Sequence, residues 1–382
     1  MKQGWKIKKL GDVATYVNGY AFKPEHWVES GTPIIRIQNL NNPDAPYNYC
    51  NFDIPSKYIV ERGDILISWS ASLGVYEWGH DNGYLNQHIF KVVFDKGDIN
   101  KYYLKYAVST KISDMLENLH GATMKHIVKK DFDNTLIPVP PIAEQEKIVA
   151  ELDCLSGIIE KKKQQLKELD NLAQSIFYEM FGDPVENDKG WETAKLKDSV
   201  IEMFLGPFGS ALKTECYVDK DASYCMVYEQ KHAIRKTLNL ETHYINQSKY
   251  NELKRFEVHS GDFIMSCRGT IGEIYRLPND APMGIIHPSV MKIRIKEDIY
   301  NPIFFNRLLS RIIKNETTSG NCVQMAITAK ELGARKPILP PLKIQQDFAS
   351  KIESIEKQKE LIAQSIKETE TLFNSRMDYY FN

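Results

Sequence analysis

Short apolar runs separated by turn residues predict β-strands in the first part of the chain. Residues 33–37, 64–69 and 88–94 are rich in β-branched and aromatic side chains, and Gly, Pro and Asn cluster between them, as in residues 39–43. One segment, residues 101–119, has apolar side chains every three or four positions, which is the spacing of an amphipathic helix ending near Gly121. The pattern therefore predicts a mostly β domain that contains one helix.

A different pattern begins at Glu144 and predicts a long helix. Apolar residues recur at alternating intervals of three and four through Met180, interrupted by no Pro and by Gly157 as the only Gly. The spacing predicts a heptad-like helix of roughly 36 residues, about 50–55 Å long at ~1.5 Å per residue. The Gly-Asp-Pro breaker at residues 182–184 ends it. The central positions of this stripe are Leu152, Leu155, Ile159, Lys162, Leu166 and Leu169.

Landmarks of the first half return in the same order in the second half. Gly-Trp-(x4)-Leu-x-Asp at residues 4–12 returns at residues 190–198. Gly-Asp, three apolar residues and Ser occupy residues 63–68 and again 261–266, and Pro-Pro at 140–141 returns at 340–341. The shared order indicates a tandem duplication of one unit, a globular domain followed by a helix.

The second half repeats the predicted elements as well. Strand candidates lie at residues 261–266 and 290–295, a helix is expected at 303–313, and Gly320 stands where Gly121 stands in the first half. A second long helix is expected over residues 345–381, again with one lysine in its stripe. The central positions of this second stripe are Ile352, Ile355, Lys359, Ile362, Ile366 and Phe373.

The two long helices are expected to pair with each other. A single amphipathic helix cannot bury its own stripe, and the domain between the two lets the second run back along the first, so an antiparallel pair is expected. The alternative is that each helix packs on its own globular domain. The stripe lysines, Lys162 and Lys359, fit either a coil with a fixed register or a groove left for a partner helix.

These patterns predict an α+β fold. Two β-rich domains stand in tandem, each is followed by a long helix, and the two helices pair as an antiparallel coiled coil. The expected limits are 1–143 and 183–343 for the domains, and 144–182 and 344–382 for the helices.

Composition excludes several classes of protein. A chain of 382 residues can hold two or three domains, and 26% charged and 42% hydrophobic residues are ordinary for a soluble protein. No apolar run approaches the roughly 18–20 residues that cross a bilayer, and no secretion signal opens the chain. The six cysteines are scattered without a Cys-x-x-Cys pair, which favours free thiols in a reducing cytoplasm. We therefore expect a cytoplasmic protein without a membrane partner.

The net charge of −1 counts mildly against a nucleic-acid binder, which is usually basic. Net charge averages over all faces, however, and basic clusters recur in both halves. They are residues 6–9 and 125–130 in the first half, and 231–236 and 249–255 in the second. A single cluster of this kind is more often a solvated face, so the recurrence is what favours binding.

No catalytic motif is present. The Pro-Pro pairs are flanked by Val and Ile, or by Leu on both sides, whereas an adenine methyltransferase needs Asn or Asp before them and an aromatic residue after. The chain has no Gly-x4-Gly-Lys-Ser/Thr loop, no Gly-x-Ser-x-Gly, no His-Glu-x-x-His and no metal-ligand spacing among its nine histidines. Asp44 with Glu144, Glu146 and Lys147 imitates a nuclease set, but a match that short is expected by chance. We predict no catalysis by this chain alone and no metal site.

The ordered double set of landmarks resembles the specificity subunit of type I restriction–modification systems. The resemblance covers nearly the whole chain, and residues 140–149, Pro-Pro-Ile-Ala-Glu-Gln-Glu-Lys-Ile-Val, are very close to the family's form. In each half a Gly also follows the Ser of the Gly-Asp motif by six residues, at Gly74 and Gly272. The second copy departs at Ile344, which stands where Glu144 stands, although Gln345 is kept.

The resemblance implies a function and partners. The two domains would be target-recognition domains, each reading one half of an asymmetric, bipartite site in double-stranded DNA. The helices would form a spacer and dock two adenine methyltransferase subunits, and restriction/translocase subunits would complete the complex. S-adenosylmethionine, ATP and magnesium are expected on the partner subunits and no cofactor on this chain. The alternative is a non-catalytic coiled-coil scaffold whose paired domains bind protein or another polymer.

Candidate DNA contacts are polar residues in loops at comparable places in the two halves, because base edges are read by polar side chains. The favoured loop follows the Gly-Asp strand, at Ser70 and Ser72 and again at Arg268 and Thr270, with a hairpin turn as the alternative. Trp5 and Trp191 are expected in the core. The other candidates are Arg36, Gln38, Asn39, Asn86, Gln87, His88, Thr123 and Lys125 in the first half and Tyr228, Gln230, Lys231, His287, Asn321 and Gln324 in the second.

Overall fold

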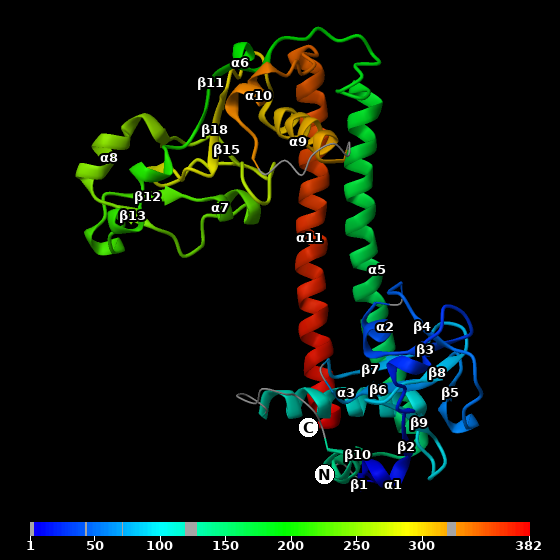
Figure 1. Cartoon of the computed structure of the whole chain (residues 1–382). Helices are drawn as coiled ribbons and strands as arrows, with labels where there is room; N and C mark the ends of the chain where they lie inside the picture. The colour runs from blue at the N-terminus through cyan, green and yellow to red at the C-terminus, as the bar shows by residue number, and fades with distance from the viewer. Residues whose placement is uncertain (1–3, 43, 71, 119–127, 319–325) are drawn as a thin grey trace. The chain divides into compact units, whose positions relative to one another are not determined.

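The computed structural model describes residues 4–42, 44–70, 72–118, 128–318 and 326–382. The chain divides into two compact units. Unit 1 comprises Met1–Gln164 and Ile362–Asn382, and unit 2 comprises Gln165–Leu361. Each unit contains one β-rich domain and part of each long helix (Figure 1).

Unit 1 contains two four-stranded sheets. In the first the strand order is β2-β9-β6-β7, with every neighbouring pair antiparallel. In the second the order is β4-β3-β8-β5, and β3 and β8 run parallel. The strands are β2 (Thr15–Asn18), β9 (Ile89–Val93), β6 (Ile65–Ser68), β7 (Gly74–Glu77), β4 (Asn48–Cys50), β3 (Thr32–Ile35), β8 (Gly83–Leu85) and β5 (Ile59–Val60).

Short elements connect these sheets to the start of the first long helix. Strand β1 (Lys6–Lys9) pairs antiparallel with β10 (Leu136–Val139), the segment just before Pro140. The basic cluster at residues 6–9 is therefore part of a strand. The helices of this domain are α1 (Leu10–Val13), α2 (Ile37–Asn41), α3 (Lys101–Asn118) and α4 (Lys129–Asn134), with 3-10 turns η1 (Pro24–His26) and η2 (Ser56–Tyr58).

Unit 2 repeats the topology of unit 1, which confirms the duplication. Its sheets have the orders β11-β18-β15-β16 and β13-β12-β17-β14, and β12 and β17 form the parallel pair. The strands are β11 (Val200–Leu205), β18 (Val290–Ile295), β15 (Phe263–Ser266), β16 (Ile274–Arg276), β13 (Tyr244–Ile245), β12 (Cys225–Tyr228), β17 (Gly284–Ile286) and β14 (Glu257–Val258).

The helices of unit 2 follow the succession of those of unit 1, with α8 added. Helix α9 stands where α3 stands, after the last strand of the first sheet (β18 or β9) and before the short helix α10 or α4. They are α6 (Leu196–Ser199), α7 (Gln230–Arg235), α8 (Gln247–Leu253), α9 (Pro302–Thr318) and α10 (Ala329–Ala334), with 3-10 turns η3 (Gly209–Ala211), η4 (Thr214–Cys216), η5 (Lys220–Ala222) and η6 (Lys254–Phe256).

The Gly-Asp motif of each domain is a turn fixed by an ion pair. Gly63 and Gly261 adopt left-handed backbones with φ of 90° and 83°, which favour glycine. The Asp64 carboxylate accepts from the Glu61 N–H at 2.8 Å and lies 2.7 Å from the Lys91 ammonium. In unit 2 the fully buried Asp262 pairs with Arg294 at 2.6 Å. The motif thus anchors β6 and β15, whose far ends lead into the favoured candidate loops.

The long helices are α5 (Ile142–Phe181) and α11 (Leu342–Phe381), each of 40 residues. In unit 1, Glu151 forms an ion pair with Arg376 at 2.8 Å, and further along α5 Lys162 donates to Ser365. The residue numbers of the partners on α11 thus decrease as those on α5 increase, so the two helices run antiparallel, as predicted (Figure 1).

The helix segments of unit 2 also run antiparallel. Lys359 donates to Asp170 at 2.8 Å, and the Phe177 ring lies 5.6 Å from that of Phe348. The stripe positions named above are all buried or half-buried. Each stripe lysine therefore has a polar partner on the other helix, which compensates for its place in an apolar seam.

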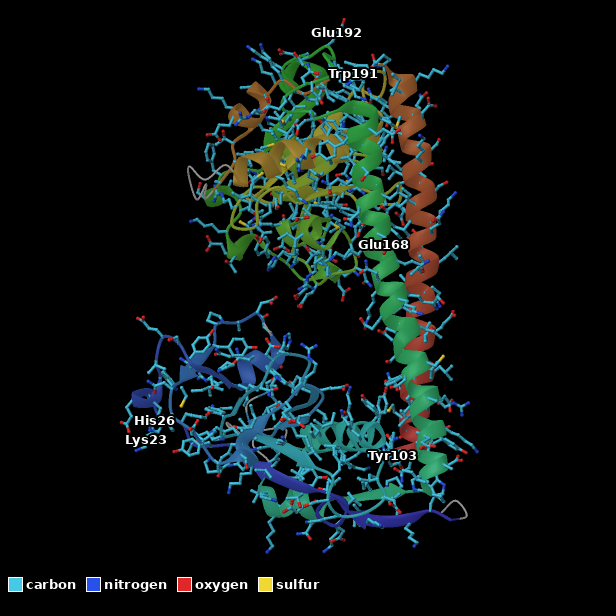
Figure 2. The ribbon with its side chains drawn as sticks, turned by 90° about the vertical axis from the view of Figure 1, so that its right-hand side faces the viewer. Lys23, His26, Tyr103, Glu168, Trp191 and Glu192 are labelled. Carbon is cyan, nitrogen blue, oxygen red and sulfur yellow. The ribbon has the colours of Figure 1, made fainter. Side chains whose placement is uncertain are left out.

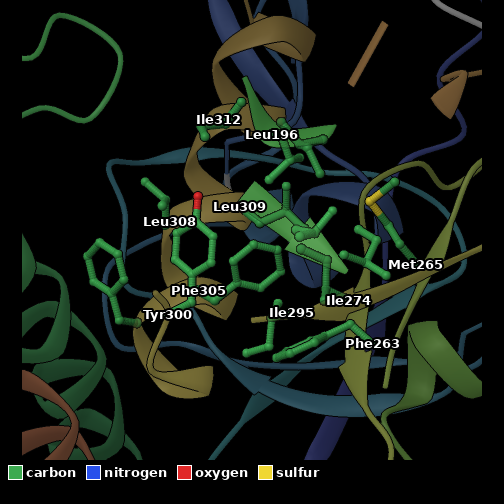
Figure 3. Packing of buried hydrophobic residues seen from close by; sticks show 14 of the residues in the cluster. Leu196, Phe263, Met265, Ile274, Ile295, Tyr300, Phe305, Leu308, Leu309 and Ile312 are labelled. Carbon is green, nitrogen blue, oxygen red and sulfur yellow. The ribbon is translucent and has the colours of Figure 1, made fainter. Parts of the chain in front are cut away.

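The helices also pack on the globular domains, so both arrangements considered from the sequence are present. In unit 1, Tyr103 of α3 lies beside α5 (Figure 2) and shares a core with Leu152 and Phe381. In unit 2, the Phe181 ring of α5 lies 4.6 Å from the Phe304 ring of α9. The neighbouring Phe305 packs against Phe263 of the first sheet, with the ring centroids 5.2 Å apart (Figure 3). Burial of each such side chain contributes roughly 1.5–3 kcal/mol.

The two tryptophans of the landmarks are half-buried at the edges of these cores. Trp191 donates its indole N–H to the Phe181 carbonyl at 2.9 Å, at the end of α5 (Figure 2). The Gly-Trp landmark of unit 2 therefore fixes how the chain leaves the long helix.

One expectation about the first domain was wrong. Residues 39–43 were expected to form a turn after a strand over 33–37, but the strand ends at Ile35 and residues 37–41 form α2. The Asn39 side chain accepts from the Arg36 N–H at 3.1 Å, which satisfies a backbone donor at the start of the helix.

Candidate nucleic-acid interface

The candidate loops of unit 1 lie side by side. The Asn86 N–H donates to the Ile35 carbonyl at 3.2 Å, and the Trp69 N–H donates to the His88 carbonyl at 3.2 Å. The loops after β3, β6 and β8 are therefore neighbours, partly because β3 and β8 run parallel and end at the same edge. Residues 18–20, 36–38, 69–70, 72 and 86–88 form loop cluster 1.

The equivalent loops of unit 2 are joined by equivalent hydrogen bonds. The His287 N–H donates to the Tyr228 carbonyl at 2.9 Å, and the Cys267 N–H donates to the Ser289 carbonyl at 2.9 Å. The loops after β12, β15 and β17 therefore meet as their counterparts do. Residues 206–210, 229–231, 267–270 and 287–289 form loop cluster 2.

Four candidates, Thr123, Lys125, Asn321 and Gln324, lie outside the described residues. The segment that follows the last two returns to loop cluster 2, because Ala326 pairs with Arg268 in an isolated β-bridge. The Ile327 N–H also donates to the Cys267 carbonyl at 3.1 Å.

Burial corrects two of the candidate contacts. Asn39 is fully buried, and its amide donates to the Ala45 carbonyl at 3.1 Å, so both ends of the side chain are used inside the domain. Tyr228 is fully buried on β12, where all four residues are buried, and its hydroxyl donates to the Pro282 carbonyl. Neither side chain can present an edge to DNA in this structure.

The remaining candidates of loop cluster 1 are exposed or half-buried. Arg36 donates to the Asn48 amide oxygen at 2.9 Å and lies over the Trp27 ring at 5.4 Å. Gln38 donates to the Pro46 carbonyl at 3.0 Å, which orients an otherwise exposed amide. Ser70, Asn86 and Gln87 are half-buried, and Ser72 is exposed.

His88 has an unusual backbone. Its φ is 73°, in the left-handed region that few residues other than Gly and Asn adopt. Its ring lies 4.9 Å from that of Trp69. The side chain is exposed, so an aromatic pair stands at the surface of loop cluster 1.

Loop cluster 2 presents cations and amides. Arg268 and Thr270 are exposed on a loop whose Gly269 has a φ of 65°. The position of a Cβ at Gly269 lies 3.9 Å from the Gln230 amide nitrogen, so Gln230 lies next to this loop. Arginine and glutamine side chains are the donors and acceptors that read purine edges in the major groove.

Glu229 is held as an anion within this cluster. Burial opposes its ionisation, but hydrogen bonds from Lys231, His243 and Thr242 outweigh it and lower the pKa of Glu229 to about 2. The distances are 2.9 Å to the Lys231 ammonium, 3.0 Å to the His243 ring nitrogen and 3.0 Å to the Thr242 hydroxyl. Glu229 therefore fixes Lys231 beside the loop.

His287 is kept neutral. Burial and the nearby charges of Arg268 and Lys231 lower its pKa below the ordinary value, against the opposite effect of Glu229. Its Nδ1 lies 2.8 Å from the Ser289 hydroxyl. At neutral pH the imidazole is a hydrogen-bonding group rather than a cation.

The sequence reasoning missed one loop in each domain. A Cβ at Gly19 would lie 1.9 Å from the Asn86 carbonyl oxygen, and a Cβ at Gly206 would lie 2.2 Å from the His287 carbonyl oxygen. The loops after β2 and β11 therefore pack against the loops after β8 and β17 within each cluster, and only glycine allows the approach. The signal in the sequence was Gly-Pro-Phe-Gly at residues 206–209.

No group of three or more His, Cys, Asp or Glu side chains that could hold a metal ion occurs among the described residues. Across the same residues, none of the helices has the length and apolar character needed to cross a membrane.

The chain contains two domains of one topology, each with a polar loop cluster and a long helix. It therefore belongs to a class of protein that carries two similar candidate binding domains in one chain. Residues 2–171 and 189–371 match the family described as type I restriction modification DNA specificity domain. Because the two matches cover most of the sequence, the chain belongs to this family.

Known proteins of the same class resemble the whole chain. The Escherichia coli type I restriction enzyme EcoBI specificity subunit is 23% identical over 376 residues, which cover 92% of this chain and 79% of that protein. The S subunit of a type I restriction–modification system from M. genitalium has a TM-score of 0.53 at 13% identity, covering 99% of this chain and 96% of the other.

A third similarity is to a chain in a structure that addresses complex assembly and conformational transition of the type I R-M system. It has a TM-score of 0.65 at 17% identity and covers 99% of this chain and 97% of that one. The structural similarities confirm the α+β fold class of two β-rich domains with long helices.

The family confirms the resemblance drawn from the landmarks. The chain provides DNA sequence specificity within a type I restriction–modification system, and it acts together with DNA and with other subunits of that system. It is not catalytic by itself, because the catalytic activities lie on partner subunits. The scaffold alternative is not favoured.

Proposed function

We propose that the chain reads an asymmetric DNA site of two unlike halves. Loop cluster 1 reads one half-site and loop cluster 2 reads the other. This proposal rests on one observation: the two domains share a topology but present different side chains at equivalent positions of their loop clusters. Ser70 in unit 1 corresponds to the exposed Arg268 in unit 2, for example, and Asn86 corresponds to His287.

The paired helices set the spacing between the half-sites. A helix of 40 residues is about 60 Å long, longer than one turn of B-DNA at about 34–36 Å. The spacer length of the DNA site follows from the length of this pair.

The outer faces of the helices dock two methyltransferase subunits, and restriction/translocase subunits join the complex. Support comes from large apolar side chains that the helices leave exposed, which mark surfaces for protein contact. These are Ile142, Ile158, Leu172, Leu361, Leu372 and Tyr379, with exposed fractions between 37% and 72%. S-adenosylmethionine, ATP and magnesium bind to the partner subunits.

Methylation mapping tests the proposal. The chain is co-expressed with the methyltransferase subunit encoded beside it, and N6-methyladenine is mapped across the host genome. The expected result is one bipartite motif with two different half-sites and a fixed spacer. Unmethylated DNA despite a stable complex that binds S-adenosylmethionine would overturn the proposal.

Salt dependence is a second readout that needs no catalysis. Affinity for duplex DNA should fall steeply with salt, because phosphate contacts release counterions. A double variant, Arg268→Ala with Gln230→Ala, should alter the letters of one half-site and leave the other half-site and the spacer unchanged.

A further inference from the structure

Phe208 projects from loop cluster 2 into solvent. Its exposed fraction is 88%, the largest of any large apolar side chain in the part of the chain that the structure describes. The preceding Pro207 is buried, so the loop turns its proline inward and its phenylalanine outward. A ring so exposed on a loop of loop cluster 2 is available to a bound partner, and its place beside the candidate DNA contacts is what gives it meaning.

The loop that carries Phe208 is held firmly at both ends. The Gly206 N–H donates to the Val290 carbonyl at 2.9 Å, and Gly206 fits against the His287 carbonyl only because it lacks a Cβ. On the other side, the Ala211 N–H donates to the Phe208 carbonyl at 2.8 Å, which opens the 3-10 turn η3. Phe208 is therefore presented by a defined turn.

The neighbours of this loop suit duplex DNA. His287, against which Gly206 packs, is close enough to Arg268 and Lys231 for both charges to affect its pKa. Cations and amides beside an apolar ring match a DNA groove, where phosphates flank the base edges. A protein surface is the competing partner, and the experiment below distinguishes it.

Unit 1 has the same loop without the ring. The Gly19 N–H donates to the Ile89 carbonyl at 3.0 Å, just as Gly206 donates to Val290. Two positions after each glycine stand Ala21 and Phe208, and both are exposed. The two readers thus differ at one equivalent place by an aromatic ring.

We propose that Phe208 determines specificity by contacting the C5-methyl group of a thymine in the half-site read by unit 2. That methyl is the apolar group on a base edge in the major groove, and phenylalanine is one of the side chains that contact it. This inference rests on the proposed function, and it adds a residue with a defined chemical target.

The test uses the full chain in complex with its methyltransferase subunit and the motif found by methylation mapping. Duplexes are prepared in which each thymine of that half-site is replaced, one at a time, by deoxyuridine, which lacks only the methyl. With the wild-type complex, one replacement should weaken binding about fourfold, the loss expected for one buried methyl. Replacements elsewhere should have little effect.

With Phe208→Ala, affinity for the thymine duplex should fall. The thymine duplex and the deoxyuridine duplex that the wild-type complex distinguishes should then bind with equal affinity. Phe208→Leu keeps an apolar group and should retain part of the difference. Ala21→Ser, at the equivalent place in unit 1, should leave the difference unchanged. Thermal unfolding of each variant confirms that it is folded.

The outcomes separate the two proposals. Without sequence-specific binding by the wild-type complex, the proposed function itself fails. If the wild-type complex binds specifically but removal of a thymine methyl never has an effect that depends on Phe208, this inference fails and the proposed function stands. The inference also fails if Phe208→Ala weakens all duplexes equally, as a wedge between bases would, or if it weakens only methyltransferase binding.

Discussion

The backbone N–H of Asn100 donates to the side-chain oxygen of Gln145 at 2.7 Å, and unit 2 repeats this bond between Asn301 and Gln345 at 2.8 Å. Each glutamine is fully buried and also donates to the carbonyl of the first proline of its Pro-Pro pair, Pro140 or Pro340, at 2.8 Å. The Pro-Pro-x-x-x-Gln landmark therefore connects the start of α3 or α9 to the start of the long helix that follows in the same unit.

Removal of this connection should destabilise the domain. Gln145→Leu leaves the Asn100 N–H and the Pro140 and Asp98 carbonyls without their partner, and unpaired buried groups cost about 1–3 kcal/mol each. The free energy of unfolding in urea should fall by roughly 2–4 kcal/mol. The exposed Glu146→Gln serves as control and should change it by less than about 0.5 kcal/mol. Equal stabilities of the two variants would contradict the assignment.

The duplication, the long helices and their antiparallel pairing were predictable because they depend on periodic patterns and repeated landmarks. The polar partners of the stripe lysines were not. Lys162 meets Ser365 and Lys359 meets Asp170, and hydroxyls and carboxylates on an exposed helix give no periodic signal. The position of each lysine in the stripe was visible, whereas its partner depends on the register of two distant segments.

The missed elements have physical reasons as well. Strand β1 is largely polar, and its partner β10 lies far away in sequence, so neither shows in local patterning. Helix α2 has five residues, too few to establish a helical period. Tyr228 was mistaken for a surface residue because β12 is buried on both faces and lacks the usual alternation.

The carboxylate of Glu229 should stabilise unit 2 in a pH-dependent manner. Its pKa is about 2 in the folded chain against an ordinary 4.5, so the contribution is complete above pH 4.5 and is lost as pH falls toward 2. Glu229→Gln should lower the free energy of unfolding by roughly 1–3 kcal/mol at pH 7, and the difference from wild type should shrink below pH 4.5. Urea unfolding at pH 7, 4 and 3 measures it.

A neighbouring carboxylate provides the control for this experiment. Glu241→Gln changes an exposed side chain and should have an effect below about 0.5 kcal/mol at every pH. A difference between wild type and Glu229→Gln that grows as pH falls from 4.5 to 3 would contradict the role assigned to Glu229.

Arg268 should influence one half-site only. The residue is exposed on the loop of unit 2 that lies next to Gln230, and a bidentate contact with a base discriminates by about 1–3 kcal/mol. Arg268→Ala should therefore weaken DNA binding roughly tenfold and relax the motif at one position of the half-site read by unit 2. Methylation mapping of the variant shows which letters change.

Lys351→Ala removes an exposed cation from α11 in the same unit and should leave every letter of the motif intact. Relaxation in both half-sites, or in the half-site that also responds to changes in loop cluster 1, would contradict the assignment of Arg268. A uniform loss of affinity with a shallower salt dependence would instead identify a phosphate contact.

The length of the helix pair should set the DNA spacer independently of the half-sites. The division of the chain into units falls within the long helices, between Gln164 and Gln165 on α5 and between Leu361 and Ile362 on α11. Seven residues inserted at both places keep the heptad phase and lengthen the pair by about 10 Å, which corresponds to roughly three base pairs. The methylated motif should keep both half-sites and gain about three positions between them. An insertion on α5 alone breaks the pairing and should abolish methylation, and an unchanged spacer after the double insertion would show that the helices do not set it.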